Sequence, residues 1–324
     1  MKKILNILLR PLGLEVNTKG LKWERDALIG LYRDRLHSIP KSTSTTVECI
    51  IFSKDRPMQL HALLSSFYEK ISCPIRVHVL YHLTTDSYKK AYIRLIELFL
   101  EKPVTFVEQR TNHSFKEDLL DILSGVESEK IFFLVDDIVI VEDLNIDDFA
   151  SFDVDRFVPS LRLGKNISHF YHFNIDQPQP AFIYQEHSGK AKFFWQWSHG
   201  KYDWGYPLSL DGHLFSTDEI ISMIRTIECK APNSLENSLN QFKSIFEDRF
   251  GVCYKKSVVL NNPCNKVQSE NENKYGDLDQ GYLLRQWHKG YQIDYRKLYG
   301  FINHSPQQEV EIQLITRTTV SGKH

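Results

Sequence analysis

Two adjacent aspartates, Asp136 and Asp137, follow the apolar run IFFLV (131–135) and precede a second apolar run at 138–141. A run of this kind is typical of a strand that is buried on both faces of a sheet. A carboxylate is costly to bury unless a positive charge meets it. The pair therefore either holds a cation or caps an ordinary turn. In the first case its oxygens would be ligands for Mg²⁺ or Mn²⁺, which commonly takes further ligands from substrate phosphates.

Alternating strands and helices must position these aspartates. We expect strands at 47–53, 75–83, 104–109 and 130–137, with helices at 58–70, 86–102 and 114–126 between them. Such alternation with short connections is typical of a parallel sheet covered by helices on both faces. In such a sheet the ligand lies outside the carboxyl ends of the strands, which is where the two aspartates fall.

The same rim carries basic and polar residues that suit a phosphate. Lys54 and Arg56 follow the first strand and Arg110 follows the third, although a solvated loop with chance basic residues is an alternative. No Walker loop and no GxGxxG follows the first strand, so a P-loop ATPase or a standard dinucleotide fold is not indicated. The residues expected at a nucleotide are Ser53, Lys54, Asp55, Arg56, Asp86, Arg110 and Asp136.

The second half is less regular and contains an aromatic stretch at 193–207. We expect strands at 155–164, 168–174, 212–216 and 252–262, and helices at 216–227, 233–250 and 279–290. Flat rings pack on the apolar C–H faces of sugars, so the stretch suggests an acceptor site. The alternative is one buried strand face that contains Trp195 and Trp197. The candidate acceptor residues are Trp195, Trp197, Tyr202, Asp203 and Trp204.

Composition narrows the class of protein. The 324 residues are 42% hydrophobic and 25% charged with a net charge of −1, which is ordinary for a globular chain and gives no general basic field for nucleic acid. Five scattered cysteines without a CxxC pair favour a reducing compartment, hence the cytoplasm. Residues 1–12 form a short basic amphipathic pattern that would either rest on the inner membrane surface or pack on its own domain.

Three stretches resemble GT-A glycosyltransferases of the family 2 type. VECIIFSKDRPMQLHALLSSF (47–67) resembles the opening strand, turn and helix of that family, and IFFLVDDIVIVED (131–143) resembles its DxD metal motif, with Ile138 in the third position. DGHLFSTDEI (211–220) followed by APNSLENSLNQF (231–242) resembles the acceptor region. The resemblance covers roughly residues 47 to 290.

The resemblance implies a fold and a domain plan. We expect a GT-A-like, mostly parallel Rossmann-like sheet flanked by helices, with a smaller mixed region on the acceptor side. The transferase domain would be 47–305, with a nucleotide-sugar half at 47–150 and an acceptor half at 151–305. An N-terminal helical segment at 1–46 and a polar tail at 306–324 would flank it.

The resemblance also implies roles for individual residues. Glu236 would be the catalytic base, with Asn237 in place of the usual second acid. Asp211 is the second candidate for the base; if it is not the base, it would hold hydroxyl groups of the acceptor or donor. Asp136 and Asp137 would hold a divalent cation, Mn²⁺ or Mg²⁺, with His304 as a third ligand.

The implied activity is metal-assisted, inverting transfer of a sugar from a UDP-, GDP- or dTDP-linked donor to a glycan or glycolipid, in bacterial cell-surface polysaccharide synthesis. One alternative is a nucleotidyltransferase, although the turn FSKDRP (52–57) lacks the glycines usual there. The other is a non-catalytic sugar- or nucleotide-binding protein of the same fold.

Overall fold

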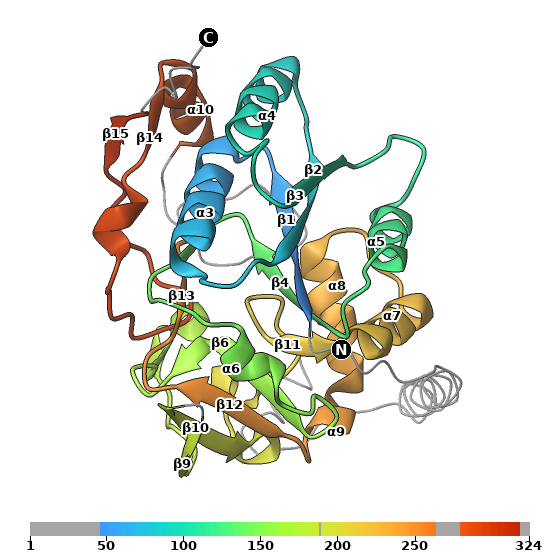
Figure 1. Cartoon of the computed structure of the whole chain (residues 1–324), viewed down its shortest axis with the longest axis vertical. Helices are drawn as coiled ribbons and strands as arrows, with labels where there is room; N and C mark the ends of the chain where they lie inside the picture. Colours follow the sequence, from blue (N-terminus) through green and yellow to red (C-terminus); the bar gives the residue numbers. More distant parts are fainter. Residues whose placement is uncertain (1–45, 188, 264–278, 318–324) are drawn as a thin grey trace, which may run out of the picture.

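The computed structural model describes residues 46–187, 189–263 and 279–317 (Figure 1). Residues 1–45 of the predicted N-terminal segment, with the amphipathic pattern at 1–12, and residues 318–324 of the predicted tail lie outside these residues. Within the described ranges no helix is long and apolar enough to cross a membrane.

A five-stranded sheet forms the centre of the molecule. Its order is β11-β4-β1-β2-β3, and every neighbouring pair is parallel except β11 with β4. The strands are β1 (Val47–Lys54), β2 (Arg76–His82), β3 (Val104–Glu108), β4 (Lys130–Val135) and β11 (Leu214–Ser216). The predicted mostly parallel α/β architecture is therefore confirmed.

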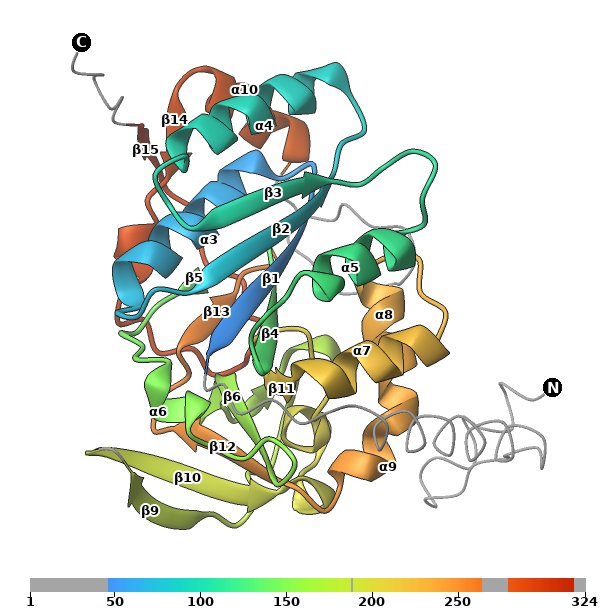
Figure 2. The same cartoon turned by 45° about the vertical axis from the view of Figure 1, so that its right-hand side comes forward.

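Helices cover both faces of this sheet. α3 (Pro57–Lys70) and α4 (Asp86–Leu98) lie on one side, and α5 (Phe115–Ser124) and α7 (Thr217–Thr226) lie together on the other (Figure 2). Alternate residues of β1 join two different cores, because successive side chains of a strand point to opposite faces. Cys49 and Ile51 pack with the α3 side, whereas Ile50 and Phe52 pack with the α5 side.

A second sheet of four strands lies below the first in Figure 1, with the order β6-β12-β10-β9. Its strands are β6 (Phe157–Gly164), β9 (Ile183–His187), β10 (Lys190–Gln196) and β12 (Phe250–Tyr254). The predicted strand at 252–262 is two strands, because the chain leaves β12 and then pairs as β13 (Val259–Asn261) with β5 (Ile138–Ile140). The predicted helix at 233–250 is likewise broken, into α8 (Pro232–Leu239), a 3-10 turn and α9 (Lys243–Phe246).

Short elements complete the second half of the chain. They are α6 (Asp147–Ala150), the hairpin of β7 (His169–Phe170), η2 (Tyr171–Phe173) and β8 (Ile175–Asp176), the 3-10 turn η4 (Tyr202–Gly205), α10 (Gln280–His288), η6 (Tyr295–Leu298), and the pair β14 (Tyr291–Ile293) and β15 (Leu314–Thr316).

Backbone hydrogen bonds at one glycine join the two halves of the chain beside β4. Gly212 N donates to Phe133 O at 2.8 Å, and Leu161 N donates to Gly212 O at 2.8 Å. Gly212 adopts φ +84°, a conformation that residues with a Cβ rarely take. On the other side of the same rim, Asn262 N donates to Asp137 O at 2.9 Å. The carboxyl half of β4 and the aspartates that follow it are thus flanked by residues 211–212 and 259–262.

Candidate active site at the carboxyl end of strand β4

The cation that meets the two aspartates in this structure is Arg56, which precedes helix α3. Its Nη1 lies 2.9 Å from Asp136 Oδ1 and 2.8 Å from Asp137 Oδ2; Arg56 and Asp136 are buried and Asp137 is mostly buried. Asp136 Oδ2 accepts two further hydrogen bonds, from Ser53 Oγ at 2.8 Å and from Lys54 N at 3.0 Å. Both oxygens of Asp136 are therefore occupied by donors of the protein itself.

Asp137 differs from Asp136 because one of its oxygens is open. Asp137 Oδ1 is buried and has no hydrogen-bond partner among the described residues. The pKa of Asp137 is raised to about 6, because burial and the charges of Asp136 and Asp211 together outweigh the opposing effect of Arg56. An unsatisfied buried carboxylate oxygen is costly, so this atom marks a place where a ligand would be stabilised.

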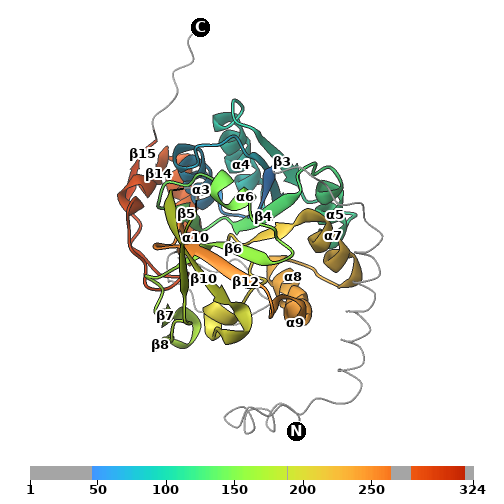
Figure 3. The ribbon, with the colours of Figure 1, turned by 60° about the horizontal axis from the view of Figure 1, so that its bottom comes forward.

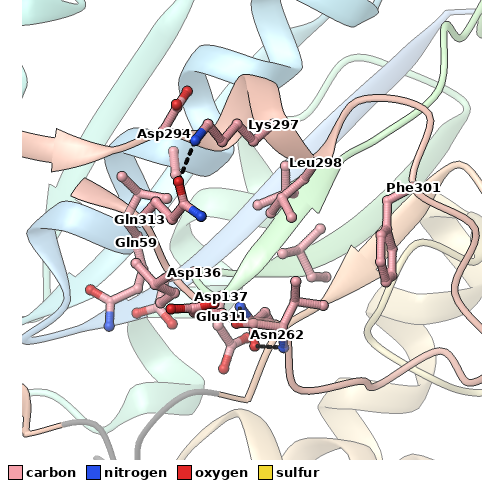
Figure 4. Close-up of a pocket in the computed structure, with 16 residues that line it drawn as sticks. Gln59, Asp136, Asp137, Asn262, Asp294, Lys297, Leu298, Phe301, Glu311 and Gln313 are labelled. Carbon is pink, nitrogen blue, oxygen red and sulfur yellow. Dashed lines mark hydrogen bonds between the residues drawn. The ribbon is translucent and has the colours of Figure 1, made fainter. Parts of the chain in front are cut away.

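A cavity of about 310 Å³ lies next to the aspartate pair. Asp136, Asp137, Asn262 and Glu311 gather at one end of it, and Asp294, Lys297 and Gln313 gather at the other (Figure 4). The walls between them are mostly apolar and come from α3, β5 and residues 293–313: Ala62, Ile138, Val139, Ile293, Leu298, Phe301, Val310 and Ile312. Sequence reasoning missed this contribution of the C-terminal segment, which has no local motif.

Arg162, on strand β6, is the centre of a second charged group on the same rim. This buried arginine donates from Nη2 to Asp203 Oδ1 at 2.8 Å and from Nη1 to Ser209 Oγ at 2.5 Å. Burial lowers the pKa of Arg162, but the nearby charges of Asp203, Asp211 and Glu236 raise it above its usual range. Sequence reasoning overlooked Arg162, although an arginine inside the apolar strand FVPSLRLG (157–164) was a visible signal.

Glu236, in helix α8, faces this group and is half-buried. The pKa of Glu236 is raised to about 7, mainly by burial and next by the charge of Asp211. Arg162 and hydrogen bonds from the Ser209 hydroxyl and the Leu210 N–H act in the opposite direction. A carboxyl group that titrates near neutral pH is suited to accept a proton from a substrate hydroxyl.

Asp211 connects the two groups. It is buried directly before Gly212, and its Oδ2 accepts hydrogen bonds from Asn261 Nδ2 and Gln307 Nε2, both at 3.4 Å. Burial raises the pKa of Asp211. Its charge in turn raises the pKa of both Asp137 and Glu236. The structure therefore brings Asp137, Asp211 and Glu236 into one electrostatic neighbourhood.

The other residues expected at a nucleotide have different environments. Arg110 pairs with Asp118 at 2.6 Å and with Asp121, so carboxylates already offset its charge, and its contact with a phosphate stays a prediction. Asp55 accepts hydrogen bonds from Thr84 N and Oγ1 at 2.9 and 2.8 Å, which holds the first turn. Asp86 is exposed in the first turn of α4. Lys54 is partly exposed and has no ion-pair partner within the described ranges.

The predicted stacking role of the three tryptophans is wrong. Trp195, Trp197 and Trp204 are 1%, 0% and 0% exposed and pack together in the core, so their rings cannot reach a sugar. Trp195 Nε1 also donates to Trp204 O at 3.0 Å. The alternative of a buried face is the correct one, because large apolar rings gain more from the core than from the rim. Tyr202, by contrast, is exposed, and Asp203 belongs to the Arg162 group.

His304 lies on the C-terminal segment with an exposed side chain. Its carbonyl oxygen accepts hydrogen bonds from Ser168 N and His169 N, both at 2.9 Å. In the part of the chain that the structure describes, no group of three or more His, Cys, Asp or Glu residues could hold a metal ion. The role of His304 as a third ligand beside Asp136 and Asp137 stays a prediction.

No protein-family model matches the chain, and no curated protein matches it in sequence. Solved structures with a related arrangement include Staphylococcus aureus TarS 1–349, with 15% identity over 66% of this chain and 59% of that chain and a TM-score of 0.45. The WbbM bifunctional glycosyltransferase matches with 15% identity, 65% and 39% coverage and a TM-score of 0.35. A nucleotidyl transferase from Methanothermobacter thermautotrophicus matches with 8% identity, 65% and 88% coverage and a TM-score of 0.36.

The match thus spans less than two thirds of the length of TarS 1–349 and of WbbM. Likenesses of this degree say nothing about catalysis, so the activity has to be inferred from the residues of the rim.

Proposed function

We propose that the chain transfers a sugar from a nucleotide-diphosphate donor to a hydroxyl group of a glycan or glycolipid. The observation that supports this most is the position of Glu236. This carboxyl has a pKa of about 7 and lies beside Asp211, on the rim that also carries Asp136 and Asp137. A base at one end of the site and a place for a diphosphate at the other are the two parts that glycosyl transfer needs.

On the acceptor side, the Glu236 carboxylate accepts the proton of the acceptor hydroxyl as the hydroxyl oxygen bonds to the anomeric carbon. The bond from that carbon to the donor diphosphate breaks at the same time. Attack from the face opposite the leaving group inverts the anomeric centre. Asp211 is too closely surrounded by Arg162, Asn261 and Gln307 to be our first choice of base, and we assign it to binding hydroxyl groups.

On the donor side, negative charge grows on the departing nucleoside diphosphate. Lys54 and Arg56 are positive charges on that part of the rim, and fixed charges of this kind stabilise a leaving group. Arg56 already neutralises part of the aspartate charge, so the donor would meet a nearly balanced site rather than two bare carboxylates.

The residues present fit a divalent cation at Asp137. Mg²⁺ commonly uses one or two protein carboxylates and takes its other ligands from water and substrate phosphates. Asp137 Oδ1 is the open oxygen, whereas both oxygens of Asp136 are occupied. When bound, the cation would supply positive charge to the diphosphate. We therefore assign the metal to Asp137, with Asp136 positioning Arg56.

The inverting course, a cytoplasmic location with residues 1–12 at the membrane, and a role in cell-surface polysaccharide synthesis belong to the same proposal. The inverting course and the pathway are supported by the sequence resemblance. The location is supported by the scattered cysteines and by the basic amphipathic pattern of residues 1–12.

Thermal unfolding in the presence of UDP, GDP, dTDP or CMP, each with and without Mn²⁺, tests the donor site. A ligand at 100 times its dissociation constant adds roughly 2.7 kcal/mol to the free energy of unfolding, which raises the melting temperature by several degrees. We expect one diphosphate to do so in a metal-dependent way, in the wild type and in Asp143→Asn but not in Asp137→Asn. Asp143 is an exposed acid on the same connection and is the matched control.

No shift with any nucleotide would refute the proposal. Release of a nucleoside diphosphate from a sugar nucleotide without acceptor would separate a transferase from a non-catalytic binding protein. Release of pyrophosphate from a nucleoside triphosphate and a sugar phosphate would instead indicate nucleotidyl transfer.

A further inference from the structure

Four aromatic side chains form an exposed surface next to the candidate active site. We call Phe170, His172, Phe173 and Tyr202 the aromatic patch. Phe173 is 66% exposed and Tyr202 is 42% exposed, which is unusual for rings of this size. Phe170 and Tyr202 are stacked, with their centroids 5.0 Å apart and an interplanar angle of 27°. Phe173 meets Phe170 edge-on at 5.4 Å, so the patch has a flat part and a raised side.

The patch is held in place by hydrogen bonds beneath it. Phe170, His172 and Phe173 belong to the β7–η2–β8 hairpin, which lies at the edge of the molecule in Figure 3. Gln177, just after this hairpin, donates from Nε2 to Asp203 Oδ2 at 2.9 Å and accepts from Asp203 N at 3.2 Å. These paired bonds join the hairpin to η4, which carries Tyr202.

Backbone geometry indicates that the exposed position of Tyr202 is enforced. Tyr202 has φ +52°, and Asn174, in the hairpin, also has φ +52°. A left-handed conformation at a bulky residue costs free energy and persists only where the surrounding structure imposes it. Such positions cluster at ligand sites, where they hold a side chain in a fixed orientation.

The aromatic patch adjoins the charged group around Arg162. Tyr202 directly precedes Asp203, which is paired with Arg162. Partial burial lowers the pKa of His172, and the charges of Asp203, Arg162 and Asp211 also act on it, which places its ring close to all three. The aromatic patch therefore lies beside the group of Arg162, Asp203 and Asp211.

We propose that the aromatic patch binds one pyranose ring of the acceptor glycan. The inference rests on the proposed transfer reaction and names the surface that would hold its acceptor. The apolar C–H face of the sugar would lie on the Tyr202 and Phe173 rings, and its hydroxyl edge would point to the carboxylates. Exposed apolar patches with polar neighbours mark interaction sites, and rigid rings lose little conformational freedom when a ligand binds. A sugar ring, flat on one face and polar at its edge, matches this arrangement.

Saturation-transfer NMR on the full chain tests the surface directly. The probes are methyl β-D-glucopyranoside, methyl β-D-galactopyranoside and methyl N-acetyl-β-D-glucosaminide, without donor. We expect saturation of the C–H protons on one face of at least one probe. Phe173→Ala combined with Tyr202→Asn should weaken binding of that probe at least tenfold. Asparagine tolerates the backbone conformation of Tyr202, so this variant should fold. Tyr184→Ala, at an exposed tyrosine of β9, should have no effect.

The melting shift with nucleoside diphosphate separates this proposal from the proposed function. If the wild type binds a nucleotide but saturation is absent or unchanged in the double variant, the aromatic patch is not the acceptor site. If sugars bind through the patch but no nucleotide binds, the transfer reaction fails and the sugar site stands. Sedimentation is measured in parallel, and a wild-type dimer that the double variant converts to a monomer would make the patch a self-interface and overturn the proposal.

Discussion

Arg56 donates to Asp137 Oδ2 at 2.8 Å through the same Nη1 that contacts Asp136. A single nitrogen thus contacts two adjacent carboxylates, and its charge offsets part of theirs. This arrangement explains how two acids can end an apolar strand without a bound metal, and it makes Arg56 part of the stability of the protein as well as of its site.

Replacement of Arg56 by alanine should destabilise the protein by about 3–5 kcal/mol at pH 7, because it leaves two buried carboxylates without their partner. The loss should be smaller at pH 5. The pKa of Asp137 is already about 6, so this carboxyl is protonated there and needs no counter-charge. Urea unfolding at both pH values measures the difference.

The control for this experiment is Arg76→Ala, at a half-exposed arginine that pairs with Glu48 and Glu127. Its loss should cost less than about 1 kcal/mol at either pH. Equal losses for the two variants would contradict the buried role of Arg56.

The pH dependence of turnover should report Glu236. A base acts in its deprotonated form, so kcat/KM should rise about tenfold per pH unit up to about pH 7 and level off above it. Glu236→Gln should lower kcat by about 10²–10⁴-fold and leave the nucleotide melting shift intact. Glu228→Gln, at an exposed acid paired with Lys116, is the matched control. Unchanged turnover in Glu236→Gln would exclude it as the base.

Ser209 should influence the pH at which kcat/KM stops rising, which we call the acid limb of the pH profile. Its hydroxyl oxygen accepts from Arg162 Nη1 at 2.5 Å and from Asp211 N at 3.3 Å, so its hydrogen is left for Glu236. A hydrogen bond to a charged group is worth about 1.5–3 kcal/mol, and one pKa unit is about 1.4 kcal/mol. Ser209→Ala should therefore move the limb to higher pH by about one unit.

Ser209→Thr retains the hydroxyl and should keep the limb near that of the wild type, while Ser222→Ala controls for loss of a buried hydroxyl elsewhere. A slower Ser209→Ala enzyme with an unmoved limb would show that Ser209 acts only on the structure.

Truncation of Trp204 should reduce stability and not acceptor binding. Its ring is fully buried against Trp195 and Phe182, so Trp204→Ala should cost about 3–5 kcal/mol in urea unfolding. The KM for acceptor, measured at a temperature where the variant is folded, should stay within about twofold of the wild type. A stable variant with a raised acceptor KM would restore the stacking role that burial argues against.

Local patterns were enough to predict the sheet and the position of the aspartate pair. The run at 131–135 and the helices beside it have periodicities that depend only on neighbouring residues, and a parallel sheet then places every strand end on one rim. The alternation of Trp195 and Trp197 was less informative, because a period of two does not say whether a face meets solvent or core.

The partners of the charged residues could not be predicted in this way. Arg56 and Asp136 are 80 residues apart, Arg162 and Ser209 are 47 apart, and Gln307 and Asp211 are 96 apart. The spacing of serine, asparagine and glutamine along the sequence does not predict such contacts. Only the tertiary structure decides which of the many polar residues meet at the rim. In it, Asp136 and Asp137 are paired with Arg56, a contact that the sequence did not indicate.

The bonds of Gly212 to Phe133 and Leu161 have a consequence for synthesis of the chain. During translation the strands β1 to β4 emerge first and can pair while the remainder is still being made. Asp211 and Asn261 cannot take their places until much later residues have left the ribosome. A nascent or truncated chain that ends before residue 259 would therefore present the acids of β4 without the segments that enclose them. The parallel strands of the sheet would form early, and the candidate active site would form only in the last steps of folding.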